Sequence, residues 1–249
     1  MQVNGIATAP RSITIGSDEH KELFCRAFID THDPYDPHAM DWPEVDAGAL
    51  ARLRAMPFWG EAISTERDVA KKVQALAPLE PDPLLREAIA LQGFEEGRHG
   101  ALLDEMLRRY DIPMPRLTDD PQRGDPLWNF MRVGYGECFD SFFAFGLYAL
   151  ACDSGFFPPA LLKTVEPIVQ EEARHILFFV NWIAWHRRNM AWWRRSYFEL
   201  KVLAVWLFLI WERLGIASDV SNGQQDNNFT MNGANQLGAD INVGELLAI

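Results

Sequence analysis

Cysteine is scarce in this sequence. Only three cysteines occur among 249 residues, which is an odd number, and no two of them are spaced as Cys-x-x-Cys. A disulfide framework is therefore not expected, and neither is a zinc site built from thiolates. This cysteine usage is typical of a reducing compartment.

Basic residues are in deficit as well. Lys and Arg number 23 against 35 Asp and Glu, which gives a formal net charge of −12, and no run of basic residues is longer than a pair. Proteins that bind nucleic-acid backbones need a basic face. Nucleic acid is therefore not expected as a partner.

Long hydrophobic runs are missing too. The longest run covers residues 202–211, which is half of the about 20 residues that a membrane-spanning helix needs. The N-terminal residues show no basic segment followed by an apolar one, so we expect no secretory signal and a cytoplasmic protein. The helix around 202–211 is expected to be buried, or to touch a membrane surface, rather than to cross a membrane.

The alternation of apolar and polar residues that is typical of β-strands is absent between residues 17 and 215, so the sequence predicts an all-α protein. Helices are predicted at 17–30, 47–56, 57–77, 83–110, 127–152, 159–189 and 192–214. The helix at 159–189 contains Pro167, where a bend or a restart is expected. The predicted units are an N-terminal helical arm (1–56), a four-helix bundle (57–190), a fifth packing helix (191–216) and an irregular polar tail (217–249).

Two segments share the pattern Glu-Glu-x-Arg-His, and both lie in predicted long helices. Within each segment, Glu-x-x-His places a carboxylate and an imidazole on one helix face, one turn apart. Both pairs lie on the apolar stripe that should face the core. A buried carboxylate without a partner is very costly, so it must be neutralised, paired or bound to a metal ion. The two pairs are Glu96 with His99 and Glu172 with His175.

The other two long helices each carry a carboxylate at the centre of the apolar stripe. Glu66 precedes the pair that begins at Glu96, and Glu137 precedes the pair that begins at Glu172. Both separations are those of a helical hairpin. One Glu from each of two helices and Glu-x-x-His from each of two more is the ligand set of ferritin-like bundles that hold two iron or manganese ions. Four carboxylates balance two divalent ions, and oxygen with imidazole ligands suits iron or manganese. The predicted metal ligands are Glu66, Glu96, His99, Glu137, Glu172 and His175.

The chain also resembles a known family. Residues 57–190 are similar to the di-iron carboxylate superfamily, and the stretches HKELFCRAFIDTHDPYDP, DSFFAFGLYALACDSGFFPP and HILFFVNWIAWHRRN resemble bacterial ferritin-like-domain proteins. The resemblance implies a ferritin-like four-helix bundle with extra N-terminal helices and an aromatic C-terminal helix. It implies a cofactor of two Fe ions, with Mn or a mixed Mn/Fe pair as alternatives. It also implies that Glu96 and Glu172 bridge the two ions.

Other residues near these ligands have open roles. We expect Glu137 and Asp140 to take part in catalysis. Asp140, one turn beyond Glu137, is interpreted as a carboxylate that orients a ligand histidine, with a local polar network or direct metal binding as alternatives. Gln92 has the same alternatives. His186 lies about 16 Å along the helix axis from the ligand histidine that precedes it, which is too far for the same metal pair.

The first glutamate of each repeated motif is predicted to be structural. Glu95 and Glu171 each precede an arginine of their own motif, Arg98 or Arg174, by three residues. An ion pair within one helix is therefore expected for each.

These patterns indicate an oxidoreductase whose two metal ions activate O₂ to oxidise an unknown, apolar organic substrate. An external electron donor is expected, because no Gly-rich nucleotide-binding loop occurs. A ferroxidase or iron-handling protein, and a non-catalytic helical module stabilised by metal, are the alternatives.

The fifth predicted helix carries more large apolar residues than a protein usually leaves in water. We expect them to pack against the bundle, a second subunit as in a homodimer, or a membrane surface, the last being the least favoured. These residues are Trp206, Leu207, Leu209, Ile210 and Trp211.

Overall fold

The structure of the protein is a computed structural model, which describes residues 13–56, 58–114 and 123–221. Every regular element in these ranges is helical and none is a β-strand, which confirms the all-α prediction. The elements are α1 (Asp18–Asp30), α2 (Ala47–Ala55), α3 (Trp59–Leu76), the 3₁₀ helix η1 (Ala77–Leu79), α4 (Pro83–Arg109), α5 (Pro126–Ser154), α6 (Pro159–Asn189) and α7 (Trp192–Ser221).

Local sequence accounts for most of the helix ends. Ser17 caps α1 as predicted, and aspartate side chains accept hydrogen bonds from the first backbone N–H groups of α2, α4 and α5. A proline opens α4, α5 and α6, at a position where no backbone N–H is needed. α5 ends at Gly155, whose φ of +64° is a left-handed conformation that glycine adopts without strain.

α6 continues through Pro167 as one helix, so the predicted alternative of a restart is wrong. One predicted boundary is wrong as well. α7 extends to Ser221, so residues 217–221 are helical rather than the start of an irregular tail, since no Gly or Pro occurs in them to stop the helix. The rest of the predicted tail, and Pro57 at the predicted start of a helix, lie outside the described residues.

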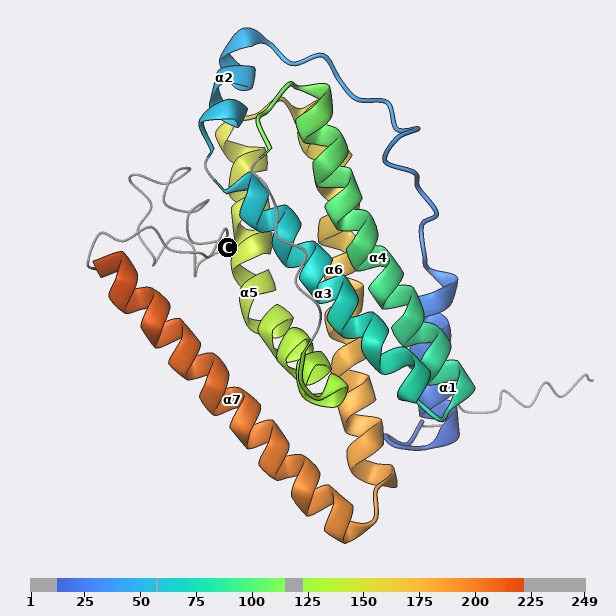
Figure 1. Ribbon diagram of the computed structural model, residues 1–249. Helices are drawn as coiled ribbons and strands as arrows, with labels where there is room; N and C mark the ends of the chain where they lie inside the picture. The colour runs from blue at the N-terminus through green and yellow to red at the C-terminus, as the bar shows by residue number, and fades with distance from the viewer. Residues whose placement is uncertain (1–12, 57, 115–122, 222–249) are drawn as a thin grey trace, which may run out of the picture.

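Four long helices, α3, α4, α5 and α6, lie side by side around a shared interior (Figure 1). Their apolar side chains form two clusters, one toward each end. One cluster includes Val73, Leu85, Phe130 and Phe179, and the other includes Ile63, Leu103, Met106 and Leu161. On each of the four helices, the predicted metal ligands lie between residues of the two clusters. A polar layer therefore separates two apolar layers.

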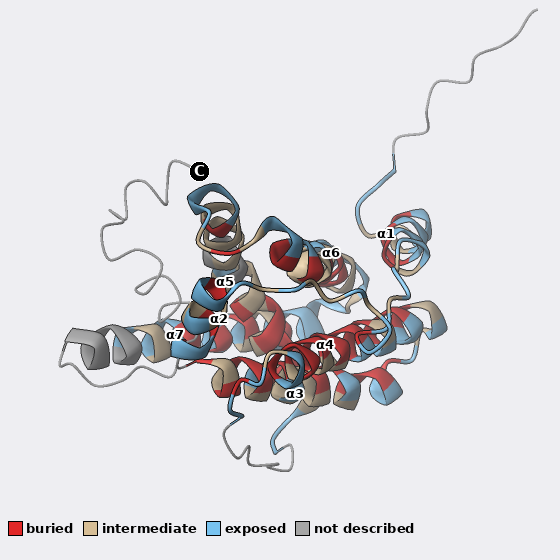
Figure 2. Ribbon diagram, turned by 90° about the horizontal axis from the view of Figure 1, so that it is seen from above, coloured by how far each residue is buried: buried red, intermediate tan, exposed pale blue. Residues whose placement is uncertain are grey.

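α1 and the segment that follows it cover α4 and α6. Phe24, Cys25 and Phe28 of α1 are buried in the first apolar cluster. Residues 31–46 then run along the long helices toward α2 at the opposite end (Figure 1). From here on, 'the arm' means this segment only, rather than the whole predicted N-terminal unit. Buried positions occur along most of α4 (Figure 2), because α3, α1 and α6 all pack against it.

α7 packs against α5 along one face only, through a buried row that contains Phe198, Val202, Val205 and Leu209. Of the five side chains predicted to be packed, Leu209 is buried. Trp206 is 38% exposed, and its ring lies 5.1 Å from the ring of Tyr135 of α5, so it also packs within the chain. The other three are exposed: Leu207 by 58%, Ile210 by 51% and Trp211 by 70%. Packing within the single chain is therefore the wrong prediction for these three.

The membrane expectation can be compared with the helices directly. Within the described residues, no helix carries an apolar stretch that would reach across a lipid bilayer.

Candidate metal centre

The six predicted ligands meet in the polar layer. α3 contributes Glu66, α5 contributes Glu137, and α4 and α6 contribute one Glu-x-x-His pair each. They form two overlapping groups, in each of which one ligand atom per residue lies within 4.8 Å of the others. The groups are Glu66, Glu96, His99 and Glu172, and Glu96, Glu137, Glu172 and His175. The two shared carboxylates are those that the family resemblance implies as bridges.

Each imidazole directs its Nδ1 atom into this layer. The Nδ1 of His99 lies 3.3 Å from Oε1 of Glu172, and the Nδ1 of His175 lies 3.0 Å from Oε1 of Glu96. Neither Nδ1 has a hydrogen bond of good geometry with any described residue, and the same holds for both carboxylate oxygens of Glu137. Buried polar atoms are almost always paired, so these unpaired atoms fit a bound group in the interior. Four carboxylates with two imidazoles fit two iron or manganese ions.

The close packing of acidic groups in this layer shifts the pKa values of several of its residues. Burial raises the pKa of Glu66 to about 7. Burial and the neighbouring carboxylates raise the pKa of Glu137 well above its ordinary value. Burial alone would lower the pKa of His99 and His175, but the glutamates around them raise both well above the ordinary value. Protons on these groups therefore supply positive charge in the layer, which a bound cation would supply instead.

The other nitrogen of each imidazole is held by a glutamate of the facing helix. The Nε2 of His99 lies 2.9 Å from Oε2 of Glu171, and the Nε2 of His175 lies 2.9 Å from Oε2 of Glu95. The first glutamate of each Glu-Glu-x-Arg-His motif thus contacts the histidine of the other motif. Such a carboxylate fixes the orientation of the ring and makes it a stronger ligand.

The arginines of the motifs reach across in the same way. Arg98 pairs with Glu171, and Arg174 pairs with Glu95. The predicted ion pairs within one helix are therefore wrong, because α4 and α6 face each other here and offer partners inside the protein. The Arg98 side chain is only 5% exposed and also donates to the backbone carbonyl of Asp33 in the arm.

The arm closes the histidine side of the layer. The Nδ1 of His32 lies 2.5 Å from Oε1 of Glu95, and the hydroxyl of Tyr35 donates to Glu171 at 3.5 Å. Burial would raise the pKa of Glu95, but two histidines and an arginine lower it to about 2. His32, Glu95 and Glu171 are close enough together to hold a cation themselves, but each of these carboxylates already pairs with an arginine.

The opposite side of the layer is open. A cavity of about 540 Å³ is lined by α3, α5 and α7, with α4 and α6 at its base. Its lining includes all four inner carboxylates and neither ligand histidine, and most of the remaining lining is apolar. Gly136, next to Glu137, leaves open space there, because no atom lies within 4 Å of where its Cβ would be. The site therefore has a closed histidine side and an open carboxylate side.

Asp140 contacts neither ligand histidine. Its carboxylate pairs with Arg213 of α7, while Arg213 and Arg132 both pair with Glu212. The predicted orienting role is wrong, because glutamates on the closed side already hold both Nε2 atoms. Of the alternatives, the structure shows the local polar network: Asp140 helps to join α5 to α7 at the charged end of the cavity.

Two further candidates lie outside the ligand groups. Gln92 is fully buried, belongs to neither group, and its amide has no hydrogen-bond partner among the described residues. His186 is 3.4 Å from Glu80, and it is absent from both groups, in agreement with its predicted distance along α6.

Sequence reasoning missed the closed side, namely the roles of Glu95, Glu171, His32 and Tyr35. One signal for the two glutamates was present. In each motif the first glutamate stands four residues before the histidine and so shares its helix face, which a solvent-exposed ion pair does not require. Nothing in the sequence pattern places the arm against this face.

Comparisons of the chain with protein-family models, with curated proteins and with solved structures gave no match. The geometry of the side chains therefore carries the interpretation of the site.

Replacing either ligand histidine should remove about one metal ion. His175→Ala takes the nitrogen ligand from one group and His99→Ala takes it from the other, so each variant should retain about half of the metal of the original protein. Elemental analysis after dialysis measures this. His38→Ala is the matched control, because its side chain is 72% exposed and pairs with Glu105 outside the layer. Full metal content in both ligand variants would contradict the assignment.

Metal binding should weaken as the pH falls below about 7. Protons compete for Glu66, whose pKa is raised to about 7, and the imidazoles must lose a proton before they can bind a cation. Binding at pH 7 should therefore release protons. Calorimetric titration with Mn²⁺ in buffers of different ionisation enthalpy measures the release. Binding without proton release, and with an affinity independent of pH, is the contrary outcome.

Arg98→Ala should lower the free energy of unfolding by about 1–3 kcal/mol, because the buried carboxylate of Glu171 loses its guanidinium partner and keeps only the imidazole of His99 and the hydroxyl of Tyr35. Arg67→Ala is the matched control, since Arg67 pairs with Asp104 at the surface and should contribute about 1 kcal/mol or less. Urea denaturation of the metal-free proteins measures both. Similar small losses in the two variants would show that the crossed pair is not a buried support.

Proposed function

We propose that this protein is a dinuclear non-haem iron, or mixed manganese/iron, oxidoreductase that activates O₂ to oxidise an apolar organic molecule. The observation that carries the proposal is the difference between the two sides of the polar layer. The histidine side is closed by Glu95, Glu171 and the arm, and the carboxylate side opens into the cavity. Ions held in this layer are therefore fixed from one side and accessible to small molecules from the other.

We assign α3, α4, α5 and α6 to the ferritin-like class of four-helix bundles. The support is the ligand set, in which two helices supply one Glu each and two supply Glu-x-x-His. The two helical hairpins are α3 with α4 and α5 with α6. In each hairpin, one helix supplies a single Glu and the other supplies Glu-x-x-His.

A reduced pair of such ions, when bound, supplies the electrons for the reduction of O₂. The residues of the chain provide the surroundings for that chemistry. Glu95 and Glu171 hold the two imidazoles in position, and the apolar lining excludes water from the carboxylate side. Glu137 lines the cavity beside Gly136, so its carboxylate lies where the layer is open to small molecules.

The cavity favours the oxidation of an organic molecule over the handling of iron as cargo. A volume of about 540 Å³ with mostly apolar walls is in the range of sites for small organic molecules. Hydrated iron ions need a polar path, because an apolar wall cannot replace their water. Electrons for repeated turnover come from a separate donor protein or molecule.

Glu137→Ala should abolish O₂ consumption while the helical content remains, because it removes one carboxylate ligand from the open side and leaves the apolar layers unchanged. The measurement is O₂ uptake and visible absorption after anaerobic loading with Fe²⁺. Asp140→Asn is the matched control on the same helix. It should retain both signals, since Asp140 pairs with Arg213 rather than with a ligand.

A third variant separates the organic oxidase from the alternatives. Gly136→Leu should fill the cavity but keep the metal and the first reaction with O₂, while equilibrium binding of naphthalene, used as an apolar probe, should be lost. Unchanged naphthalene binding in Gly136→Leu would contradict the cavity assignment. O₂ uptake with iron accumulating in a large particle would support an iron store instead, and metal without O₂ uptake would support the non-catalytic module.

A further inference from the structure

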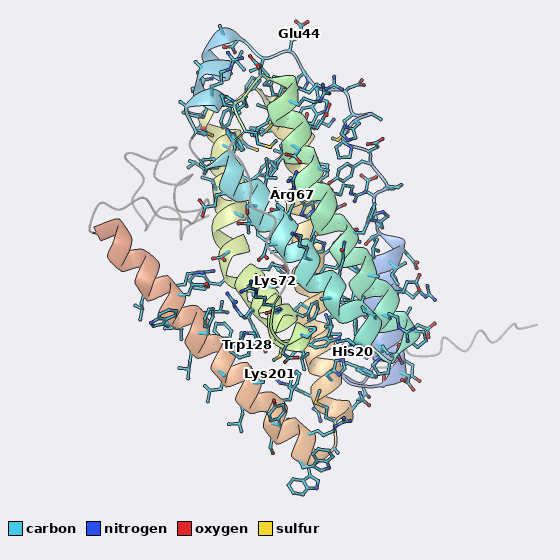
Figure 3. The ribbon with its side chains drawn as sticks, viewed as in Figure 1. His20, Glu44, Arg67, Lys72, Trp128 and Lys201 are labelled. Carbon is cyan, nitrogen blue, oxygen red and sulfur yellow. The ribbon has the colours of Figure 1, made fainter. Side chains whose placement is uncertain are left out.

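The outer face of α7 carries a continuous row of exposed apolar side chains. They project away from the rest of the protein on the side opposite α5 (Figure 3). The row belongs to a helix whose other face is buried, so α7 is apolar on two opposite sides. The exposed members are Trp193 (60%), Leu200 (65%), Leu203 (54%), Leu207 (58%), Ile210 (51%) and Leu214 (66%).

The spacing of this row is that of a helix-pairing seam. From Trp193 to Leu214 the members follow one another at alternating steps of three and four residues, with Ser196 as the one polar member. That repeat is the heptad pattern that lets two helices pack with interlocking side chains. Tyr197 and Trp211, which are 66% and 70% exposed, widen the seam on one side.

The seam and the α5 contact use different positions of the same heptads. The residues of α7 that are buried in the apolar cluster shared with α5 and α6 are Phe198, Val202, Val205 and Leu209, and none of them belongs to the seam. A second helix could therefore dock on α7 without disturbing its contact with α5.

Three basic groups that border the seam are already paired within the chain, while Arg194 lies over the ring of Trp193. Arg195 pairs with Glu199, Lys201 pairs with Asp125, and Arg213 pairs with Glu212. A partner that covers the seam would therefore not have to supply opposite charges for these groups.

We infer that the seam of α7 binds the same seam of a second copy of this chain, in a symmetric antiparallel helix pair. An isologous contact needs a surface that is complementary to itself, and an uncharged heptad row meets that condition. The exposed side chains of the seam and its flank present on the order of 1,000 Å² of mostly apolar surface, which is comparable with the roughly 800 Å² that each partner buries in a standard interface. Antiparallel packing also separates the two N-terminal ends, which carry Arg194 and Arg195.

A second copy fits this surface better than lipid does. Any apolar helix face can bind to a lipid surface, whatever the spacing of its residues. Packing against a partner helix requires a heptad repeat, and the seam has one.

The pairing has a consequence for the cavity. Leu209, Glu212 and Arg213 line the cavity and belong to the same helix as the seam. Docking of a second copy would hold this wall of the cavity from outside. The dimer does not depend on the proposed reaction, because the molecular mass can be measured without metal or O₂.

The test is sedimentation equilibrium of the full chain in detergent-free buffer at micromolar concentration. We expect the mass of a dimer. Leu207→Glu should weaken self-association by about 100-fold or more, because each dimer would bury two unpaired carboxylates. Leu200→Glu should act in the same way. Leu177→Glu is the matched control: Leu177 is 63% exposed on α6, outside the seam, and this variant should stay dimeric.

Circular dichroism and metal content should be unchanged in the seam variants, since their side chains point away from α5. A monomeric full chain would overturn the inference, and so would a dimer that neither seam variant weakens. Flotation of the full chain with neutral or anionic vesicles completes the test. A chain that is monomeric in buffer and floats through the seam binds lipid there instead of a second copy.

Discussion

The structure depends on one electrostatic constraint: four carboxylates lie at one level among four helices, two of them (Glu66 and Glu96) buried and two (Glu137 and Glu172) half-buried. Such a layer requires compensating positive charge, and two divalent ions would supply it where protons otherwise must. The two apolar clusters on either side of the layer stabilise the bundle by hydrophobic packing, which the charged side chains of the layer do not provide. The remaining features of the site follow from the way in which the ligands are held in that layer.

The helices α4 and α6 are tied together by reciprocal contacts. Glu95 and Arg98 of one motif reach Glu171, Arg174 and the histidine of the other, and the other motif returns the same contacts. These pairs occupy the oxygens of both outer glutamates, so that the inner carboxylates alone are left for metal. The open cavity on the far side is the counterpart of this closed side. The layer thus holds the ligand histidines in fixed positions on one side and lets small molecules reach the carboxylates on the other.

Much of the site followed from helix periodicity. Glu66, Glu96, Glu137 and Glu172 were predicted to face inward because each interrupts an apolar stripe, and the structure brings all four together with the two histidines. Asp140 shares the stripe of Glu137, yet it pairs with α7, because one further turn along α5 carries it past the ligand layer. Periodicity gives the face of a residue and its height along one helix. It does not give the neighbour that occupies the space opposite.

The sequence by itself determined the all-α class, most helix ends and the inward face of the ligands, because caps, prolines and the 3.6-residue period act within a single helix. Only the tertiary structure decided which partners those residues meet. The crossed pairs of Arg98 and Arg174, the arm over Glu95 and Glu171, and the cavity on one side of the layer all join segments distant in sequence. The two apolar faces of α7 likewise became distinct only when α5 covered one of them, because which face of a helix is buried depends on the elements beside it.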